Sequence, residues 1–250
     1  MIRHIVWDWN GTLFNDQEVV LAATNASLLA IGVQHHVTAD QYKDLYQRPM
    51  EDFYAALIGS PIPDAQWPAL DAAFAEYYLS HMRDCGLSAD AVAAMDAWAP
   101  RTQSLLSMFG HDDLLRLTGE FELHGRFHRI DGRPPDPDFG PKAKYLVKHV
   151  EHLLAQAPEL SPDQIALIGD CADDAHAAAH VGASAVLYTG GSSSRSVLEK
   201  VGVPVVDGVA AAARTVESLV ALGLTTGARA EFARPPAKPY TGLLADFQIR

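Results

Sequence analysis

An acidic side chain follows the first apolar segment of the chain, in a position suited to chemistry. The segment 2–16 (IRHIVWDWNGTLFND) contains the apolar run Ile5–Trp7, which ends at Asp8, and Gly11 and Thr12 follow in a sharp turn. Open α/β sheets bind their ligands beyond the carboxyl ends of buried strands. Asp8 is therefore expected to serve as a nucleophile or as a metal ligand.

The elements that would position Asp8 alternate between short apolar runs and helical patterns. Beyond residue 86, strands are predicted at 102–107, 127–130, 164–168, 183–188 and 203–206. Helices are predicted at 87–98, 111–117, 142–154, 172–181, 197–201 and 209–222. Strands that alternate with helices predict an α/β fold with a Rossmann-like, doubly wound parallel sheet that is covered on both faces.

A helical block precedes this pattern, between residues 16 and 85. Apolar residues recur there at helical spacing, and no strand-rich run separates them. We expect an inserted all-helical cap domain over residues 16–85, and an α/β core domain made of residues 1–15 and 86–224. Scattered apolar residues and three prolines predict that residues 225–250 form an extended C-terminal tail.

The sequence DWNGT at Asp8 resembles the first motif of the haloacid dehalogenase (HAD) superfamily, which is usually Asp-x-Asp-Gly-Thr. Three later positions extend the resemblance in the expected order. Ser107 ends a predicted strand, Lys142 begins a predicted helix, and Gly169–Asp174 matches the acidic Gly-Asp-x-x-x-Asp motif. The chain resembles most the phosphoglycolate phosphatase-like branch, which carries a helical C1-type cap.

This resemblance implies a hydrolase that works through a phosphorylated aspartate. Asp8 would attack phosphorus and share a Mg²⁺ ion with the substrate. The metal site would comprise Asp8, Asp170, Asp174 and the carbonyl of Asn10, because hard oxygen ligands suit Mg²⁺. Asp174 would assist the metal or pair with a lysine, and Asp173 is a second candidate for that role.

The remaining candidates would hold the phosphate group. Gly11 and Thr12 would offer backbone N–H groups, Ser107 a hydroxyl, and Lys142 a positive charge. Lys144 is the alternative to Lys142, which lies nearer the preceding loop.

Asn10 is the departure from the family's usual motif, in which the second aspartate donates and accepts the proton. A side-chain amide cannot do this near neutral pH, and a positioned acid or base contributes about 10²–10⁴-fold. Three explanations fit. In the first, the protein is a phosphatase whose leaving group needs little protonation, or in which another residue serves as acid and base. In the second, the protein binds a phosphorylated ligand with little or no turnover. In the third, the asparagine was introduced to trap a phosphoenzyme.

The composition narrows the choice of partners. Lys and Arg number 19 against 31 Asp and Glu, for a formal net charge of −12, and no basic run interrupts this balance. Nucleic acid and membrane surfaces are therefore not expected as partners. Cys85 and Cys171 show no disulfide or zinc spacing, and with no targeting or membrane segment evident, a cytoplasmic location is expected.

Together these features predict an enzyme, a Mg²⁺-dependent phosphatase-like hydrolase acting on a small phosphorylated metabolite through an aspartyl phosphate. Arg48, on the predicted cap, would recognise an anionic group of that substrate. The alternative is a weakly active or non-hydrolytic HAD-fold protein that binds a phosphorylated ligand. Both interpretations are compatible with a homodimer.

Overall fold

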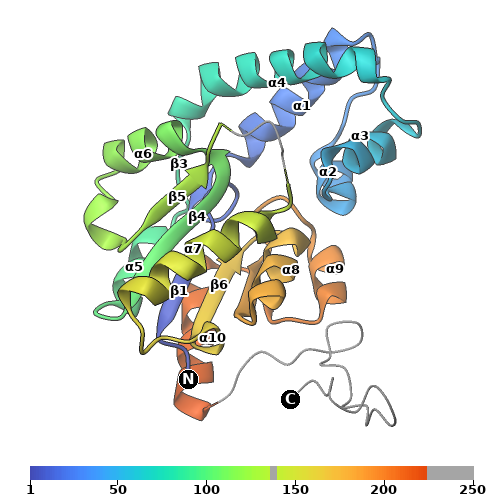
Figure 1. Ribbon diagram of the computed structural model, residues 1–250. Helices are drawn as coiled ribbons and strands as arrows, with labels where there is room; N and C mark the ends of the chain where they lie inside the picture. Colours follow the sequence, from blue (N-terminus) through green and yellow to red (C-terminus); the bar gives the residue numbers. More distant parts are fainter. Residues whose placement is uncertain (136–139, 224–250) are drawn as a thin grey trace, which may run out of the picture.

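The centre of the molecule is a six-stranded sheet in the order β5-β4-β1-β6-β7-β8, in which all neighbouring strands are parallel (Figure 1). The computed structural model describes residues 1–135 and 140–223, so the predicted tail lies outside the described residues. The prediction of a parallel α/β sheet is confirmed. Its strands are β1 (His4–Trp7), β4 (Thr102–Gly110), β5 (Ile130–Arg133), β6 (Ile165–Gly169), β7 (Ser184–Tyr188) and β8 (Val205–Val206).

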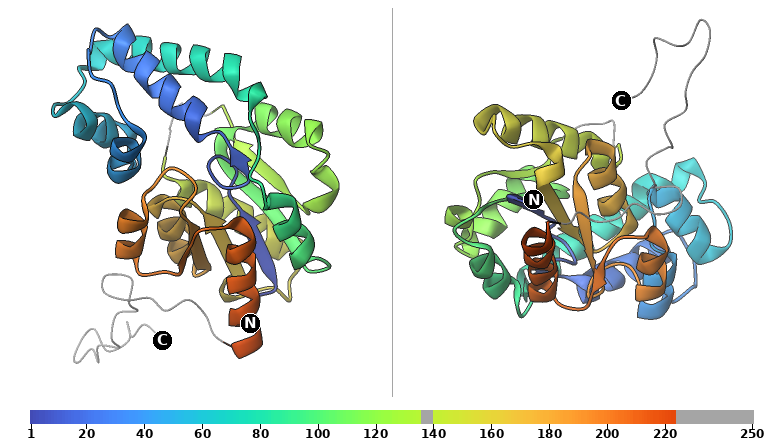
Figure 2. Two further views of the ribbon diagram at one scale, coloured as in Figure 1. Left: turned by 180° about the vertical axis from the view of Figure 1, so that it is seen from behind. Right: turned by 90° about the horizontal axis from the view of Figure 1, so that it is seen from below.

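Helices cover both faces of this sheet, as the alternating pattern predicts (Figures 1 and 2). None of the helices within residues 1–135 and 140–223 is long and apolar enough to cross a membrane. The helices of this core are α5 (Ala91–Trp98), α6 (His111–Glu120), α7 (Lys142–Gln156), α8 (Ala172–Val181), α9 (Arg195–Leu198) and α10 (Val209–Leu222).

Successive side chains of the central strand β1 reach opposite faces of the sheet. Ile5 and Trp7 pack with residues of α5, α6 and α10, whereas Val6 packs with residues of α7 and α8. All three side chains are completely buried. Strand residues alternate between the two faces, so a parallel strand covered on both sides is apolar at every position. This packing explains why the run Ile5–Trp7 lies at the centre of the sheet.

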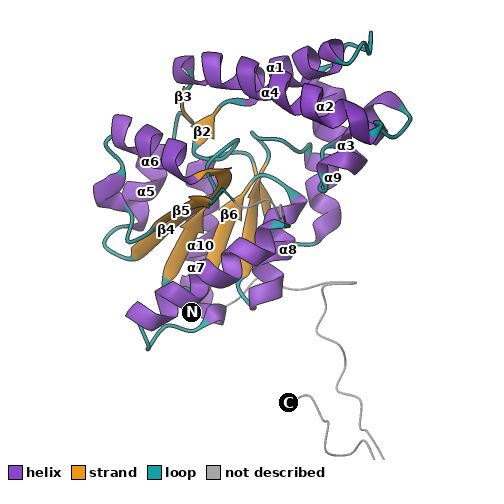
Figure 3. Cartoon of the chain, turned by 45° about the horizontal axis from the view of Figure 1, so that its top comes forward, coloured by secondary structure: helices purple, strands orange, loops and turns teal. Residues whose placement is uncertain are grey.

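A helical unit stands over the carboxyl-terminal edge of the sheet (Figures 1 and 3). Its helices pack around their own apolar cluster, which includes Leu28, Phe53 and Leu70 and is separate from the two clusters on the sheet. The long helices α1 and α4 lie side by side (Figure 2). The unit comprises α1 (Gln17–Ala30), α2 (Ala39–Leu45), α3 (Met50–Ile58) and α4 (Trp67–His81).

Two short strands tie together the connections between this helical unit and the core. β2 (Phe14–Asn15) pairs antiparallel with β3 (Gly86–Leu87). These strands directly flank residues 16 and 85, the boundaries expected for the cap. The helical insertion itself is confirmed, whereas its behaviour as a separate domain stays a prediction.

Three details differ from the prediction. The strand expected at 127–130 lies at Ile130–Arg133 instead, three residues further along the chain. The expectation that Ser107 ends a strand is wrong, because β4 continues to Gly110 after an irregularity in its pairing with β5. The strands β2 and β3 were not expected, because two residues are too few to show an alternating pattern.

A chain of buried polar side chains crosses the core between β1 and α7. His4 Nδ1 is 2.8 Å from Thr102 Oγ1 and Nε2 is 2.7 Å from Ser104 Oγ. The same Ser104 oxygen is 2.8 Å from His149 Nε2, and His149 Nδ1 is 2.7 Å from Asp131 Oδ2. Burial, aided by two nearby histidines, lowers the pKa of His4 to about 3.

We expect this buried histidine to make the protein less stable in acid. Below pH 6.5 the unfolded chain protonates His4, whereas the folded protein keeps it neutral down to about pH 3. The free energy of unfolding should therefore fall as pH decreases through this window, by about 1.4 kcal/mol per pH unit from this group. Urea unfolding of the wild type and of His4→Gln at pH 7.5 and 5.0 isolates the contribution of His4 to this pH dependence. The variant should lose about 2 kcal/mol less than the wild type between these pH values, and equal losses would contradict the assignment.

Candidate active site

The candidate residues meet at the carboxyl-terminal edge of three adjacent strands. Asp8 follows β1, Ser107 lies on β4, and Asp170 follows β6, and β1 pairs with both β4 and β6. In the sheet, β4 lies on one side of β1 and β6 lies on the other. This reversal of direction in the strand order creates the switch point where such sheets bind ligands. Lys142, the first residue of α7, reaches the same place.

Lys142 links two carboxylates. Its ammonium group forms ion pairs with Asp8 Oδ1 and Asp174 Oδ1, and its side chain is 3% exposed. Burial alone would lower the pKa of Lys142, but the charges of Asp174 and Asp8 outweigh burial and raise it. Lys144, the sequence alternative, instead places its Nζ 5.8 Å from the centre of the Tyr145 ring. Lys142 is therefore the lysine that contacts the expected nucleophile.

Asp174 is held entirely by groups of the protein. Its Oδ1 accepts from Lys142, and its Oδ2 accepts the backbone N–H groups of Asp170 and Cys171 at 3.0 and 3.1 Å. Burial alone would raise the pKa of Asp174, but Lys142 and the donors at Cys171 lower it. The contact expected of a lysine partner is thus present. Ligand atoms of Asp174, Asp170 and Cys171 also lie within 4.8 Å of one another, and the role of Asp174 at a metal stays a prediction.

Asp170 lies where two loops approach it closely. The backbone N–H of Ser192 donates to its Oδ2 at 2.5 Å. A Cβ atom at Gly11 would lie 2.4 Å from that oxygen, and a Cβ at Gly191 would lie 2.1 Å from it. Gly11 also has a φ of +70°, which other residues rarely adopt. Glycine at both positions is what allows these loops to enclose the carboxylate.

The cluster carries more buried negative than positive charge. Among the described residues, the buried carboxylates of Asp8, Asp170 and Asp174 lie together with one buried lysine, Lys142, which pairs with Asp8 and Asp174. Burial, together with Asp8 and Asp174, raises the pKa of Asp170 well above its usual range. Burial also raises the pKa of Asp8, with Lys142 opposing this effect. Such an excess of buried carboxylate is the arrangement that a cation would stabilise.

Asn10 is fixed by hydrogen bonds on both sides of its amide. Its Nδ2 donates to Asp16 Oδ2 at 2.8 Å and to the hydroxyl oxygen of Tyr78 at 2.8 Å. Ser107 donates from Oγ to Asn10 Oδ1 at 3.2 Å. Tyr78 donates in turn to Asp16 Oδ2 at 2.7 Å. Burial raises the pKa of Asp16, and hydrogen bonds from Tyr78, Asn10 and Gly11 oppose this rise. A carboxylate thus stands beside the amide, although the motif itself has only asparagine.

Gly11 and Thr12 shape the turn, but their N–H groups are already in use. The Gly11 N–H donates to the Phe14 carbonyl at 2.9 Å and to Asp16 Oδ1 at 3.0 Å. The Thr12 N–H donates to the Trp9 carbonyl at 3.1 Å, and its hydroxyl donates to Asp8 Oδ2 at 3.3 Å. The Thr12 hydroxyl therefore positions Asp8 and the Gly11 N–H positions Asp16. Binding of phosphate by the two N–H groups stays a prediction.

The helical unit reaches across the site and contacts the core on the far side. Arg48 Nε lies 3.7 Å from Asp173 Oδ2. The backbone N–H of Ser194 donates to the carbonyl of Lys43 at 2.9 Å. Arg48, singled out from the sequence, therefore lies over the core, and Asp173 faces it from α8.

A cavity of about 440 Å³ lies between the helical unit and the sheet. Its floor includes Asp8, Asn10, Lys142 and Asp170, and side chains of α1 to α4 form its roof. The cavity gathers the sequence candidates Asp8, Asn10, Arg48, Ser107, Lys142, Asp170, Asp173 and Asp174.

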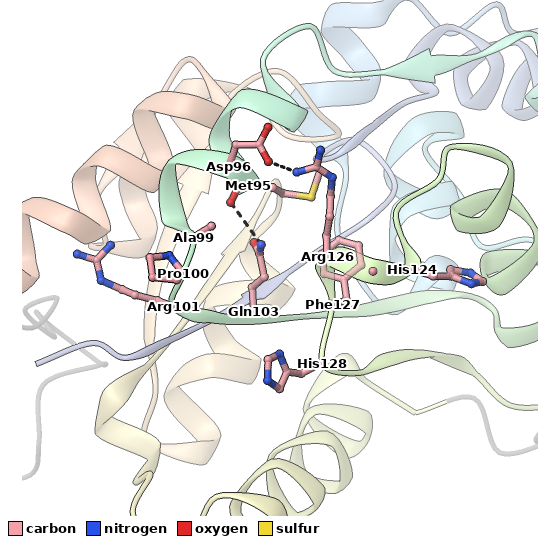
Figure 4. Close-up of a pocket in the computed structure, with 11 residues that line it drawn as sticks. Met95, Asp96, Ala99, Pro100, Arg101, Gln103, His124, Arg126, Phe127 and His128 are labelled. Atoms are coloured by element: carbon pink, nitrogen blue, oxygen red, sulfur yellow. Dashed lines mark hydrogen bonds and ion pairs between the residues drawn. The ribbon is translucent and has the colours of Figure 1, made fainter.

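A second cavity, of about 520 Å³, lies at the opposite end of the sheet, where β4 begins (Figure 4). Several of its polar side chains are paired with protein groups. Arg126 pairs with Asp96, and Gln103 donates to the Met95 carbonyl. Because it holds no cluster of carboxylates and no candidate nucleophile, we assign the chemistry to the first cavity.

Sequence reasoning missed three contributors to the site. They are Asp16, which the sequence marks only as the start of the cap, Tyr78 and Ser192. The spacing of Asp16, six residues after Asn10 in the same tight turn, is a signal that could have identified it. Tyr78 and Ser192 come from distant parts of the chain, and nothing local to the first motif predicts them.

Residues 141–222 match a family model described as HAD-hydrolase-like. No curated protein matches the chain. A predicted phosphatase from Clostridium acetobutylicum has a TM-score of 0.72 and 16% identity, covering 88% of this chain and all of that one. A haloacid dehalogenase-like family protein from Streptococcus pneumoniae has a TM-score of 0.68 and 19% identity, covering 88% and 98%. A predicted phosphoglycolate phosphatase from Haemophilus somnus has a TM-score of 0.64 and 16% identity, covering 86% and 98%.

The chain therefore has the fold of the HAD superfamily, with a parallel core and a helical insertion. The resemblance inferred from the motifs is confirmed by the family match and by these structures.

Proposed function

We propose that the protein is a Mg²⁺-dependent phosphatase-type hydrolase of small phosphorylated metabolites. The observation that carries this proposal is the contact of Asp8 with Lys142 at the switch point of the sheet, beside the buried carboxylate of Asp170. The fold neighbours named as phosphatases support the same class of reaction.

In the proposed reaction, a carboxylate oxygen of Asp8 forms a bond to phosphorus while the ester P–O bond breaks. The alkoxide leaves and takes up a proton from solvent, which gives the alcohol. Water then attacks the phosphorus of the aspartyl phosphate and loses a proton to solvent, the P–O bond to Asp8 breaks, and inorganic phosphate leaves. Lys142 offsets the negative charge that gathers on the phosphoryl oxygens, which is the main contribution a protein makes to this transfer. Asp174 holds Lys142 in place.

The donor set fits a hard divalent cation. Three buried carboxylates against one buried lysine leave an excess negative charge, and carboxylate and carbonyl oxygens suit Mg²⁺. Asp8, Asp170 and the backbone carbonyl of Asn10 would hold the ion. Bound there, it would let an anionic nucleophile and an anionic phosphate come together.

Turnover of a panel of phosphate esters with and without Mg²⁺ tests the proposed function. Release of phosphate that depends on Mg²⁺ is the expected result. Tight binding of a phosphate mimic with no release from any ester would instead favour the alternative, a non-hydrolytic protein that binds a phosphorylated ligand.

Removing Asp170 should abolish Mg²⁺ binding. Calorimetric titration of metal-free wild type should show one ion per chain, whereas Asp170→Ala and Asp170→Asn should show none, because a buried carboxylate ligand is lost. Asp163→Asn removes an exposed carboxylate and should bind as the wild type does. Unchanged affinity in both Asp170 variants would contradict the metal assignment.

We propose that residues 16–85 act as a cap that opens and closes over the site. Its two connections run through the β2–β3 pair, and its contacts at Arg48 and Lys43 hold it on the core. Lids of this kind exclude water and complete active sites. Hydrogen exchange with and without Mg²⁺ and vanadate should show added protection around residues 14–17, 43–48 and 84–88. Protection confined to the core strands would count against a cap.

A further inference from the structure

The roof of the active-site cavity is built mainly from aromatic and aliphatic side chains. They come from the helical unit and from the end of β4, and they face the cavity above the carboxylate floor. The cavity's volume of about 440 Å³ leaves room for much more than a phosphate group. The large apolar or aromatic side chains of this wall include Tyr42, Tyr54, Phe74, Tyr78, Leu79 and Phe109.

Two of these tyrosines have hydroxyl groups that are bound to the protein. The Tyr54 hydroxyl lies 3.0 Å from Ser27 Oγ, inside the helical unit. The Tyr78 hydroxyl donates to Asp16 at 2.7 Å. Both residues are buried, so what they add to the cavity wall is mainly ring surface.

The charged side chains of the upper wall either contact protein groups or are negative, like a carboxylate that a substrate could carry beside its phosphate. Arg48 faces Asp173 at 3.7 Å, and Arg133 Nε donates to the Met108 carbonyl at 3.2 Å. Asp71, an exposed carboxylate at the rim of the cavity, would repel a carboxylate on the substrate. Asp173 thus offsets part of the charge of Arg48, and Asp71 makes the rim unfavourable for a carboxylate on the substrate.

Leu79 gives this wall an exposed apolar surface. It lines the cavity from α4 and is 45% exposed. Exposed apolar side chains that gather in a concave site are typical of ligand-binding surfaces. An apolar group of a bound substrate would cover this surface and be removed from water with it.

We propose that the substrate is a phosphate monoester whose alcohol part carries a large apolar group, which binds against Phe74, Leu79 and the neighbouring rings. This inference rests on the proposed function, since the phosphate is placed at Asp8 and Lys142. It names the chemistry of the part of the substrate that does not react.

Binding of alkylphosphonates in the presence of Mg²⁺ tests this proposal without any turnover. From ethyl- to butyl- to hexylphosphonate, each added methylene should tighten binding by up to about fourfold, and by at least tenfold over the series. Hexylphosphonate should also bind at least tenfold more tightly than 5-carboxypentyl- or 5-aminopentylphosphonate. A flat series, no binding at all, or tighter binding of either charged compound would overturn the inference. Failure of the proposed function would show separately, as phosphonate binding without ester hydrolysis.

Two variants and a matched control test whether the gain in affinity with alkyl chain length comes from contacts with the roof of the cavity. Leu79→Asn and Phe74→Leu should each reduce the hexyl-to-ethyl affinity ratio by threefold or more. Leu29→Asn changes another exposed leucine, 61% exposed on α1 and outside the cavity lining, and should leave the ratio unchanged. Equal ratios in the wild type and both roof variants would place the apolar group elsewhere and contradict the proposal.

Discussion

Asp8→Asn should lower kcat for every phosphate ester by roughly 10⁵-fold, the scale on which loss of a covalent nucleophile is felt. The amide is similar in size to the carboxylate, but it cannot form the P–O bond proposed here. Lys142 would keep its contact with Asp174, so the site should still bind a phosphate mimic. Steady-state rates measure the loss of turnover, and acid-quenched mass spectra detect the phosphoenzyme. Only the wild type should carry a phosphoryl group at position 8.

The control for this experiment is Asp163→Asn, which removes one negative charge at an exposed position before β6, at the opposite end of that strand from Asp170. Its rate should equal that of the wild type. Retention of turnover in Asp8→Asn, or a phosphoryl group that remains in that variant, would contradict the assignment of Asp8 as the nucleophile.

The core could be predicted because its physical constraints are local. Ile5–Trp7 and 165–168 are apolar runs, as a parallel strand buried on both faces requires. An acidic residue follows each run, directly at Asp8 and after Gly169 at Asp170. The carboxyl ends of adjacent strands necessarily meet, so Asp8 and Asp170 could be brought together without a structure. The choice of Lys142 over Lys144 also needed only the position of the helix start.

The contacts that complete the site could not be predicted, because they join separate elements. Ser192 reaches Asp170 through a loop whose path depends on Gly191. Tyr78 lies on α4 and meets Asp16 only after the helical unit folds back across the core. Periodicity identifies the buried face of such a helix, but it does not say which buried hydroxyl finds a polar partner.

These contacts change the question raised by Asn10. The sequence shows a missing carboxylate, whereas the structure shows a carboxylate at Asp16 that accepts from the Asn10 amide at 2.8 Å. An aspartate at position 10 would therefore face another carboxylate at hydrogen-bond distance. Two such groups cannot both ionise readily, so the pair would retain a proton at higher pH than an isolated aspartate.

Asn10→Asp should accelerate hydrolysis of alkyl phosphates by about 10²–10⁴-fold, the usual contribution of a positioned general acid. The retained proton would lie beside the departing alkoxide, which is strongly basic and needs it. Aryl and acyl phosphates depart as weakly basic anions and should gain much less. Rates for both substrate classes in the wild type and the variant, measured from pH 5 to 8, give this comparison directly.

Two further variants separate proton transfer from a mere change of charge. Asn15→Asp adds a carboxylate at an exposed position in β2 and should leave both substrate classes unaffected. Asn10→Asp combined with Asp16→Asn exchanges the two groups and preserves their hydrogen bond, but it removes the second charge. The introduced carboxyl should then lose its proton at lower pH, so its advantage for alkyl esters should shift to more acidic solution. A flat response of alkyl esters to Asn10→Asp at every pH would mean that proton transfer at position 10 does not limit this protein.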